Sequence, residues 1–545
     1  MGVQTLTSGN TLRESLVESL RNTLSPRRKL LAEFRASWSR PGTKDSWLVS
    51  RHFDLTRGAP SVAVVDDKTW GDLEYPAIFA ALDSTITPLG SQVLFKKLRS
   101  YVDDSADLAD DYRGYETLRR DPGLREAVQL MLARIRTDSH ATIADYIFGE
   151  PPVKPRYAAL AVVQSLLSVA APIALMTLSA SPLLWIAAVM MNAAITFVVS
   201  PRLHREVEAL KDCTSLLSVA DGLGALGART PSSCAQLNRL CAEMSARLQV
   251  RRAFRYFKLS RGSTVTEALA LWINLLFLTD LLAYIRIVDR FLQFRPVLAS
   301  TFELVGSLDA DIAIASFLER NPDHCQPSID AEPIIDLQCA YHPLLVKPVK
   351  SSVRLEGRSA LVTGSNMAGK TTFIKTVGTN IILGRTLGFC LASRATVPKS
   401  TVMASIRGEH SVETGKSHYF AEIEAIKTFF TCATRGECRV FLIDELFSGT
   451  NTTERLAAAR AVLEQLCKEA QVLVTTHDIE LQVALGERFD LYHFLEDPDI
   501  EGFFDYQLRP GVTQERNAIR LLARMDFPVE VVRKALAYSA RGIDR

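Results

Sequence analysis

The chain has 545 residues, which is too long for a single hydrophobic core and predicts two to four domains. Its 63 Lys and Arg residues are nearly balanced by 61 Asp and Glu residues, so a chain-wide attraction to nucleic acid is excluded and any such binding needs a local patch. The nine cysteines form no Cys-x-x-Cys pair, which excludes the common zinc and disulfide patterns and predicts reduced thiols in a cytosolic compartment.

The first part of the chain is basic, and the part after it is helical. Residues 1–69 are predicted to form an N-terminal basic segment, with a cluster of cations between Arg21 and Lys44. From Trp70 to Ile135 the apolar residues recur at helical spacing. Asp121-Pro122-Gly123 predicts a turn between two of these helices.

Residues 157–199 contain two apolar runs without a charged side chain. The runs, Tyr157–Leu178 and Leu183–Val199, flank a short turn and have cations on both outer sides. As helices they would span about 33 Å and about 26 Å, close to the ~30 Å hydrocarbon core of a bilayer. We therefore predict a two-helix transmembrane hairpin with both flanks in the cytoplasm. The alternative is a buried helical hairpin in a soluble protein.

A row of cations follows the hairpin. Arg247, Arg251, Arg255 and Lys258 recur at spacings of three and four, which places them on one face of a helix. Such a face could meet the phosphates of lipid or nucleic acid. A solvated face of a long helix is an equally good interpretation.

A phosphate-binding loop is predicted where the sequence changes to short strands alternating with helices. Ser359–Thr363 reads as a strand, and the residues after it fit the Walker A pattern between a strand and a helix. Lys370 is expected to contact the β- and γ-phosphates of ATP, and the Thr371 hydroxyl to bind Mg²⁺. The predicted nucleotide-binding residues are Gly364, Ser365, Asn366, Met367, Ala368, Gly369, Lys370, Thr371 and Thr372.

Two further strands end in residues suited to hydrolysis. Val440–Ile443 leads to Asp444 and Glu445, the Walker B arrangement, in which Asp444 is a Mg²⁺ ligand and Glu445 activates the attacking water. Val472–Thr475 leads to His477, which can sense the γ-phosphate or polarise the water. The alternatives are a surface turn for the acidic pair and a structural role for the histidine.

Together these segments resemble the MutS family of ATPases. Gly364-Ser-Asn-Met-Ala-Gly-Lys-Thr-Thr is similar to the phosphate-binding loop of that family, and Asp444-Glu445-Leu-Phe-Ser-Gly-Thr-Asn-Thr to its second motif. Thr414-Gly-Lys-Ser417 resembles its signature loop. The resemblance implies that Ser417 acts on the γ-phosphate of a partner subunit, and therefore that a homodimer holds two composite sites.

The resemblance also covers the middle of the chain. Leu82–Ser91 is similar to the start of the MutS core and lever domain, and Tyr341-His342-Pro343 to the entry of its ATPase domain. The mismatch-recognition and connector domains of MutS have no counterpart in these 545 residues. The expected fold is a mostly α-helical core and lever domain over residues 70–330, followed by an α/β P-loop ATPase domain of the ABC type over residues 331–545.

Three functions remain open from the sequence. The first is an ATPase that couples lever motion to the cytoplasmic membrane, with the ATPase domain in the cytoplasm. The second is a cytoplasmic DNA-binding ATPase of repair or recombination with a buried apolar hairpin. The third, a scaffold that uses nucleotide as a structural ligand, is disfavoured by the intact set Lys370, Thr371, Asp444 and Glu445, because a scaffold needs no water-activating acid.

Overall fold

The structure is a computed structural model, and it divides into two compact units. The helical unit comprises Met1–Pro60, Ala80–Lys96 and Arg113–Arg320, and the sheet unit comprises Ser61–Phe79, Lys97–Tyr112 and Asn321–Arg545. The domain limits predicted from the sequence stay a prediction. The described residues are 26–42, 49–58, 63–135, 142–154, 158–178, 181–230, 234–254, 264–365, 368–406, 418–436, 439–447, 451–496, 504–512, 519, 522–523, 525 and 527–541.

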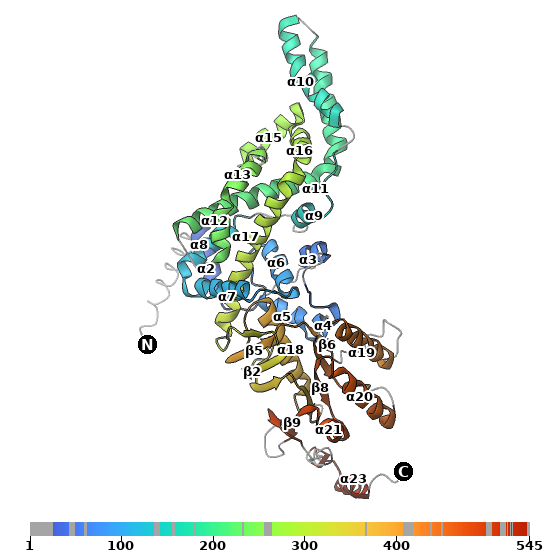
Figure 1. The fold of residues 1–545 in the computed structure, drawn as a ribbon. Coiled ribbons are helices and arrows are strands. Elements are labelled where there is room, and N and C mark those ends of the chain that lie inside the picture. The colour runs from blue at the N-terminus through green and yellow to red at the C-terminus, as the bar shows by residue number, and fades with distance from the viewer. Residues whose placement is uncertain are drawn as a thin grey trace, which may run out of the picture. The chain divides into compact units, whose positions relative to one another are not determined.

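The helical unit is built from helices alone within the described residues (Figure 1). The turn predicted at Asp121 is confirmed: its side chain accepts a hydrogen bond from the Leu124 N–H at 2.9 Å and Pro122 begins the next helix. The helices that lie in this unit wholly or in part are α2 (Pro26–Ser37), α3 (Arg51–Thr56), α5 (Tyr75–Leu82), α6 (Pro88–Arg99), α7 (Ser105–Arg120), α8 (Pro122–Leu132), α9 (Thr142–Phe148), α10 (Ala158–Leu178), α11 (Pro182–Arg229), α12 (Ala235–Ala242), α13 (Met244–Ala253), α15 (Thr264–Phe277), α16 (Thr279–Val288) and α17 (Phe291–Arg320).

A buried carboxylate fixes the loop before α6. Asp309 of α17 is fully buried and accepts hydrogen bonds from the backbone N–H groups of Ile86 and Thr87, at 2.9 and 2.7 Å. Its carboxylate also accepts from the Thr87 hydroxyl at 2.6 Å. A Cβ atom at Gly90 would lie 2.3 Å from that carboxylate, so only glycine fits there. These contacts explain the hydroxyl residue at Thr87 and the glycine at Gly90.

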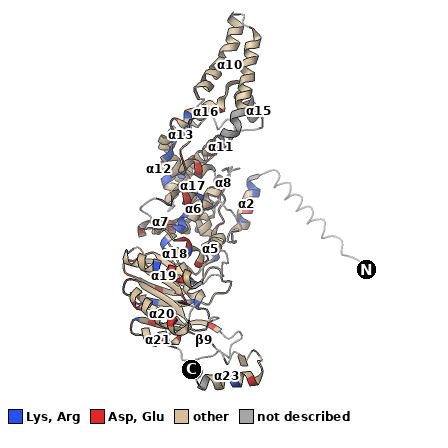
Figure 2. Cartoon of the chain, turned by 90° about the vertical axis from the view of Figure 1, so that its right-hand side faces the viewer, with Lys and Arg blue, Asp and Glu red and all other residues tan. Residues whose placement is uncertain are grey.

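The apolar runs form α10 and the first part of α11. Among the residues that the structure describes, no helix is both long enough and apolar enough to cross a membrane. The predicted transmembrane hairpin over residues 157–199 and the predicted location at the cytoplasmic membrane are therefore wrong. The second run is not a separate short helix, because it continues into the charged remainder of the 48-residue α11. Figure 2 shows no residue of α10 in the colours of charged residues, and several of its large apolar residues are exposed.

A polar seam lies inside this otherwise apolar hairpin. Asn192 of α11 is fully buried, and its amide donates to the Ser168 hydroxyl at 2.8 Å and to the Leu276 carbonyl at 2.6 Å. Ser165 donates to the Phe277 carbonyl at 2.8 Å. Helix α15 ends at Phe277, so these two carbonyls have lost their helical partners and the hairpin supplies donors in their place. The prediction from the sequence rested only on the lack of charged residues in the two runs, so it did not include the polar face formed by Ser165, Ser168 and Asn192.

The sheet unit contains two sheets. A four-stranded sheet has the order β1-β5-β2-β3, and a six-stranded sheet has the order β10-β9-β4-β8-β7-β6. In the six-stranded sheet every neighbouring pair is parallel except β10 with β9. The strands are β1 (Ser328–Asp330), β2 (Ile334–Ala340), β3 (Ser351–Glu356), β4 (Ser359–Thr363), β5 (Arg394–Pro398), β6 (Val402–Ser405), β7 (Val440–Asp444), β8 (Gln471–Thr476), β9 (Phe489–Glu496) and β10 (Phe504–Pro510).

The parallel order brings three predicted strand ends together. Strands β4, β7 and β8 lie where the apolar runs predicted them, and every residue of the three is buried. β8 pairs with β4 on one side and with β7 on the other, so their carboxyl ends share one edge of the sheet. The further helices of this unit are α4 (Asp67–Asp72), α18 (Lys370–Thr386), α19 (His418–Thr434), α20 (Thr452–Leu466), α21 (Ile479–Leu485) and α23 (Val529–Arg541).

Candidate nucleotide site

The loop between β4 and α18 uses two glycines in conformations that other residues rarely adopt. Gly364 has φ +140°, and a Cβ atom there would lie 3.1 Å from the Phe494 carbonyl oxygen. Gly369 has φ +100° and directly precedes the first residue of α18. Glycine at both positions lets the backbone turn tightly into the helix. The N-terminus of α18 is therefore presented as an anion-binding end.

Most side chains predicted to bind the nucleotide surround this turn. Lys370 is buried and its ammonium donates to the Gly364 carbonyl at 2.6 Å, so the charge lies over the loop. Ala368 is fully buried, whereas Thr372 is exposed. The buried Ser365 hydroxyl has no hydrogen-bond partner within the described part of the chain. Asn366 and Met367 lie outside the described residues.

A hydroxyl and a carboxylate meet where Mg²⁺ was predicted. The Thr371 hydroxyl donates to Asp444 Oδ2 at 2.8 Å, which joins the start of α18 to the end of β7. The Thr475 hydroxyl of β8 donates to Asp444 Oδ1. Asp444 is 6% exposed. Hydroxyl and carboxylate oxygens are the ligands that Mg²⁺ prefers, and two rotatable hydroxyls can release the carboxylate to a metal ion.

The predicted catalytic pair lies at the same edge. Glu445 adopts a left-handed conformation with φ +56°, which is uncommon outside glycine and turns the chain sharply at the strand end. Its Oε1 lies 3.2 Å from His477 Nδ1. This hydrogen bond raises the pKa of His477 above its ordinary value, against the opposing effect of burial. Asp478 is held by the Arg455 guanidinium at 2.7 Å, which fixes the backbone next to the histidine.

The donor set fits a nucleoside triphosphate with magnesium. The buried Ser365 hydroxyl, the two glycine turns and the Lys370 ammonium form a cradle for phosphate oxygens. Thr371 and Asp444 would supply oxygen ligands for the metal ion beside it. Ser417, the residue expected to act across a dimer, lies outside the described residues.

One residue beside the loop was not predicted from the sequence. The ring of Tyr506 in β10 lies next to Gly369, where a Cβ atom would approach its Cδ1 to 3.2 Å. Tyr506 has φ +55° and sits where the pairing of β9 with β10 shifts register. The side chain is 45% exposed. A lone tyrosine in a strand carries no sequence signal, because its position depends on the register shift.

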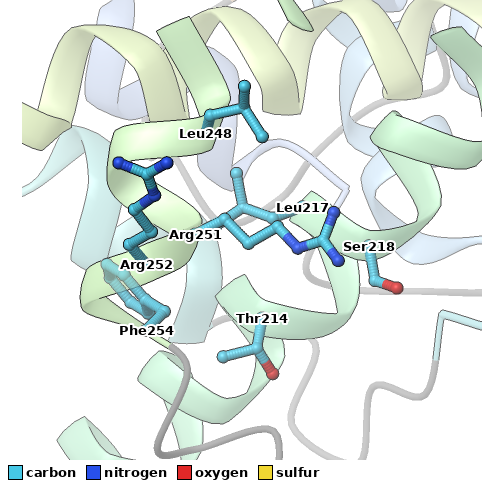
Figure 3. A pocket seen from close by; sticks show the side chains of 7 residues that line it. All are labelled: Thr214, Leu217, Ser218, Leu248, Arg251, Arg252 and Phe254. Carbon is cyan, nitrogen blue, oxygen red and sulfur yellow. The ribbon is translucent and has the colours of Figure 1, made fainter. Parts of the chain in front are cut away.

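The cationic row after the hairpin does not form one phosphate-facing surface. Arg247 is fully buried and its Nε lies 3.3 Å from Asp221, so its charge is compensated inside the helical unit. Arg251 also contacts Asp221, at 2.8 Å. Figure 3 shows that the guanidinium groups of Arg251 and Arg252 point in different directions from a hollow of about 290 Å³. Arg255 and Lys258 lie outside the described residues.

Comparison with known proteins identifies the region that holds this site. Residues 360–541 match MutS domain V. The C-terminal region of the chain is therefore similar to MutS domain V. The matched residues include the loop after β4, Asp444, Glu445 and His477, so the candidate site lies within the matched region.

The curated relatives that this chain matches come from bacteria and archaea. The endonuclease MutS2 of Thermus thermophilus is 30% identical over 247 residues, which cover 44% of this chain and 32% of the relative. The DNA mismatch repair protein MutS of Natronomonas pharaonis is 29% identical over 266 residues, which cover 45% of this chain and 31% of the relative. The endonuclease MutS2 of Carboxydothermus hydrogenoformans is 29% identical over 245 residues, which cover 44% of this chain and 31% of the relative. The chain thus spans about a third of the length of the curated relatives it matches.

Proposed function

We propose that the chain is a MutS-type ATPase that binds and hydrolyses ATP with Mg²⁺. The observation that carries the proposal is the convergence of Thr371, Asp444, Glu445 and His477 at the carboxyl ends of three neighbouring parallel strands. Phosphoryl transfer to water requires a phosphate-binding loop, a pair of metal ligands and an acid that activates water, all close together. These groups lie at one edge of the sheet.

Each side chain has a distinct part in this proposal. Lys370 neutralises phosphate charge from a buried position, so its ammonium acts in a site of low dielectric. Thr371 and Asp444 hold the metal ion, which would offset charge on the phosphate oxygens when bound. Glu445 accepts a proton from the attacking water, and His477 orients that carboxylate through the 3.2 Å contact.

The aromatic ring of Tyr506 has a place in the same proposal. Its ring lies beside the phosphate-binding loop and is partly exposed. An exposed aromatic face at the mouth of a phosphate site can stack on a nucleotide base. Tyr506→Ala should therefore weaken ATP binding several-fold, and Tyr506→Phe should leave it unchanged.

We further propose that the active form is a homodimer with two composite sites. Ser417 belongs to the segment that resembles the MutS signature loop, and in this proposal it contacts the γ-phosphate held by the partner. ATP binding would then close the dimer and move the helical unit. Ser417→Ala should lower ATP hydrolysis without weakening ATP binding to monomers.

The proposed activity is tested by replacing the catalytic acid. Glu445→Gln should bind ATP with unchanged affinity and lose turnover by at least about a hundredfold, because the amide accepts no proton. Glu480→Gln, a change at a nearby exposed acid of α21, is the matched control and should hydrolyse ATP at the normal rate. Normal hydrolysis by Glu445→Gln, measured as phosphate release, would sink the assigned role.

A DNA-directed function is the second part of the proposal. The relatives are named for DNA mismatch repair and as endonucleases, and we propose a role in DNA repair or recombination for this chain. Arg27, Arg28 and Lys29 of α2 are exposed consecutive cations and form a local patch for DNA phosphates. This patch replaces the predicted row that begins at the buried Arg247.

The patch is tested by salt titration of DNA binding. Duplex, mismatched and branched DNA should each bind with an affinity that falls as salt rises. Changing Arg27, Arg28 and Lys29 to Ala should reduce the slope of log affinity against log salt by about 0.9 for each DNA phosphate that is no longer neutralised. An unchanged slope for all three DNA structures would exclude this patch and leave the ATPase proposal intact.

A further inference from the structure

The edge strand of the six-stranded sheet is protected by side chains from far upstream. Among the described strands β6 pairs with β7 on one side only, so the N–H groups on its other side would be unsatisfied. Instead, the N–H of Val402 donates to the Tyr101 hydroxyl at 3.2 Å, and that of Ala404 to the Thr69 hydroxyl at 2.9 Å. The N–H of Ile406, just after the strand, donates to the Asp72 carboxylate at 2.8 Å. Three alternate N–H groups are thus paired without another strand.

The acceptors are held firmly in place. Asp66 caps α4 by accepting from the Thr69 N–H at 2.9 Å and from its hydroxyl at 2.5 Å. Arg99 contacts the Asp67 carboxylate and lies 4.8 Å from the centre of the Trp70 ring. Because α4 is anchored on both sides, the oxygens that face β6 are fixed.

The segment from Asp66 to Tyr75 also contacts α18, the helix that follows the phosphate-binding loop. The Tyr75 hydroxyl, fully buried, donates to the Thr379 carbonyl of α18 at 3.2 Å. Glu74 pairs with Lys375 of α18 at 3.1 Å, and Glu74 has φ +58°. That left-handed residue turns the chain between α4 and α5, so that Asp72 faces β6 while Tyr75 faces α18. We call residues Asp66–Tyr75 the clamp.

We propose that the clamp is a working part of the ATPase and that Asp72 is a positioning residue for hydrolysis. The clamp joins α18, which carries Lys370 and Thr371, to β6 and Ile406. The candidate Ser417 follows Ile406 in the sequence by eleven residues. It lies outside the region matched to MutS domain V and yet belongs to the same compact unit. Its Asp72 carboxylate holds the N–H of Ile406 and acts on hydrolysis through that residue. This inference rests on the proposed function.

The first test separates the hydrogen bond from the charge of Asp72. Asp72→Ala should lower the turnover number about tenfold and leave the affinity for ATP within twofold. Asp72→Asn keeps an acceptor oxygen for the Ile406 N–H and should retain turnover within about threefold. Asp323→Ala is the matched control, because it removes an exposed carboxylate and its ion pair to Lys350 in the same unit but outside the clamp, and it should behave as the wild type.

The second test uses mixed dimers to decide which subunit's site Asp72 serves. With Lys370→Ala on one subunit and Asp72→Ala on the other, one composite site keeps two intact halves and about half of the wild-type turnover should remain. With both changes on one subunit and a wild-type partner, almost no turnover should remain. The reverse pattern would mean that Asp72 serves its own subunit's site through α18, and equal activity in both arrangements would remove its role; either result overturns the proposal.

The controls keep this inference separate from the proposed function. If the wild type fails to hydrolyse ATP, or if Lys370→Ala hydrolyses it normally, the proposed function fails. If hydrolysis depends on Lys370 but not on Asp72, only the inference fails. Should Asp72→Ala not fold, Asp72→Ser takes its place, since the shorter hydroxyl cannot span the distance to Ile406.

Discussion

Two buried aspartates, one in each unit, are held by different kinds of hydrogen-bond donor. Asp309 in the helical unit and Asp444 in the sheet unit are 0% and 6% exposed, and each is hydrogen-bonded through both carboxylate oxygens. The donors differ. Asp309 is held mainly by backbone N–H groups, whereas Asp444 is held by two threonine hydroxyls.

This difference decides what each carboxylate can do. A backbone N–H cannot turn away, so a carboxylate bound to two of them is committed to the fold. A hydroxyl can rotate and become an acceptor, so a carboxylate bound to hydroxyls can be given to a metal ion without breaking the main chain. We therefore expect Asp309 to govern stability and Asp444 to govern ligand binding. Four substitutions, taken from the largest expected effect to the smallest, can break or sharpen that contrast.

Asp309→Asn should lower the free energy of unfolding of the helical unit by about 3 kcal/mol, because the amide NH₂ would face the backbone N–H groups of Ile86 or Thr87. Chemical denaturation followed by circular dichroism measures the change. ATP binding at temperatures below the transition should be unaffected. Unchanged stability would show that the Asp309 contacts are not fixed by the main chain.

Asp444→Asn should behave in the opposite way. Without ligand, its stability should stay within about 1 kcal/mol of the wild type, since both hydroxyls can reorient toward an amide. The stabilisation by Mg²⁺ and ATP, about 2.7 kcal/mol at a ligand concentration of 100 times Kd, should be lost. Thermal unfolding with and without Mg²⁺ and ATP measures both quantities. Asp309→Asn is the control and should keep the ligand-dependent gain.

In the hairpin, the Asn192 side chain also bonds to the main chain, but as a donor to a carbonyl group. Like Asp309, it should therefore affect stability. Asn192→Leu removes the donor to the Leu276 carbonyl and should reduce the free energy of local opening by about 1–2 kcal/mol. Hydrogen exchange of the α10, α11 and α15 amides measures this opening. Met191→Leu, a change at a neighbouring exposed position, should have no effect beyond about 0.5 kcal/mol. Equal protection in the two variants would argue against the polar seam.

His477 gives a pH test of the ligand-binding edge. Its pKa is raised by the hydrogen bond to Glu445, so the pair is stabilised at low pH and loses that contribution as pH rises through the raised value. While charged, His477 holds the Glu445 carboxylate and weakens it as a base. ATP turnover should therefore rise several-fold as pH increases through that pKa, and His477→Gln should remove this rise. A rise that persists in His477→Gln must come from another group.

Local patterns predicted the strands of the site well. Buried apolar runs ending in Gly364, Asp444 and Thr476 were sufficient to predict β4, β7 and β8, because a buried parallel strand needs little beyond continuous apolar residues. The clamp and Tyr506 could not be predicted in this way. Asp72 is more than three hundred residues from Ile406 in sequence, and no local pattern links them.

The hairpin shows where the same reasoning failed. Residues 157–199 carry no charge, and this absence predicted a membrane span that the structure does not support. The amino-acid composition shows that these helices lack charged residues, but it does not show which segments they pack against. The inner face made by Ser165, Ser168 and Asn192 matters only because α15 ends at Phe277 and leaves carbonyls in need of donors.

The sequence alone predicted the strand-loop-helix unit that carries Gly364, Lys370 and Thr371, because residues a few positions apart along such a unit are placed by local geometry. It also determined the apolar character of α10 and the hydroxyl-rich loop before α6. Only the tertiary structure decided which aspartate is committed to the fold, which arginine is buried, and which distant acid reaches the edge of the sheet. These outcomes depend on hydrogen bonds between segments far apart in the chain, and such bonds form only when each unit is packed.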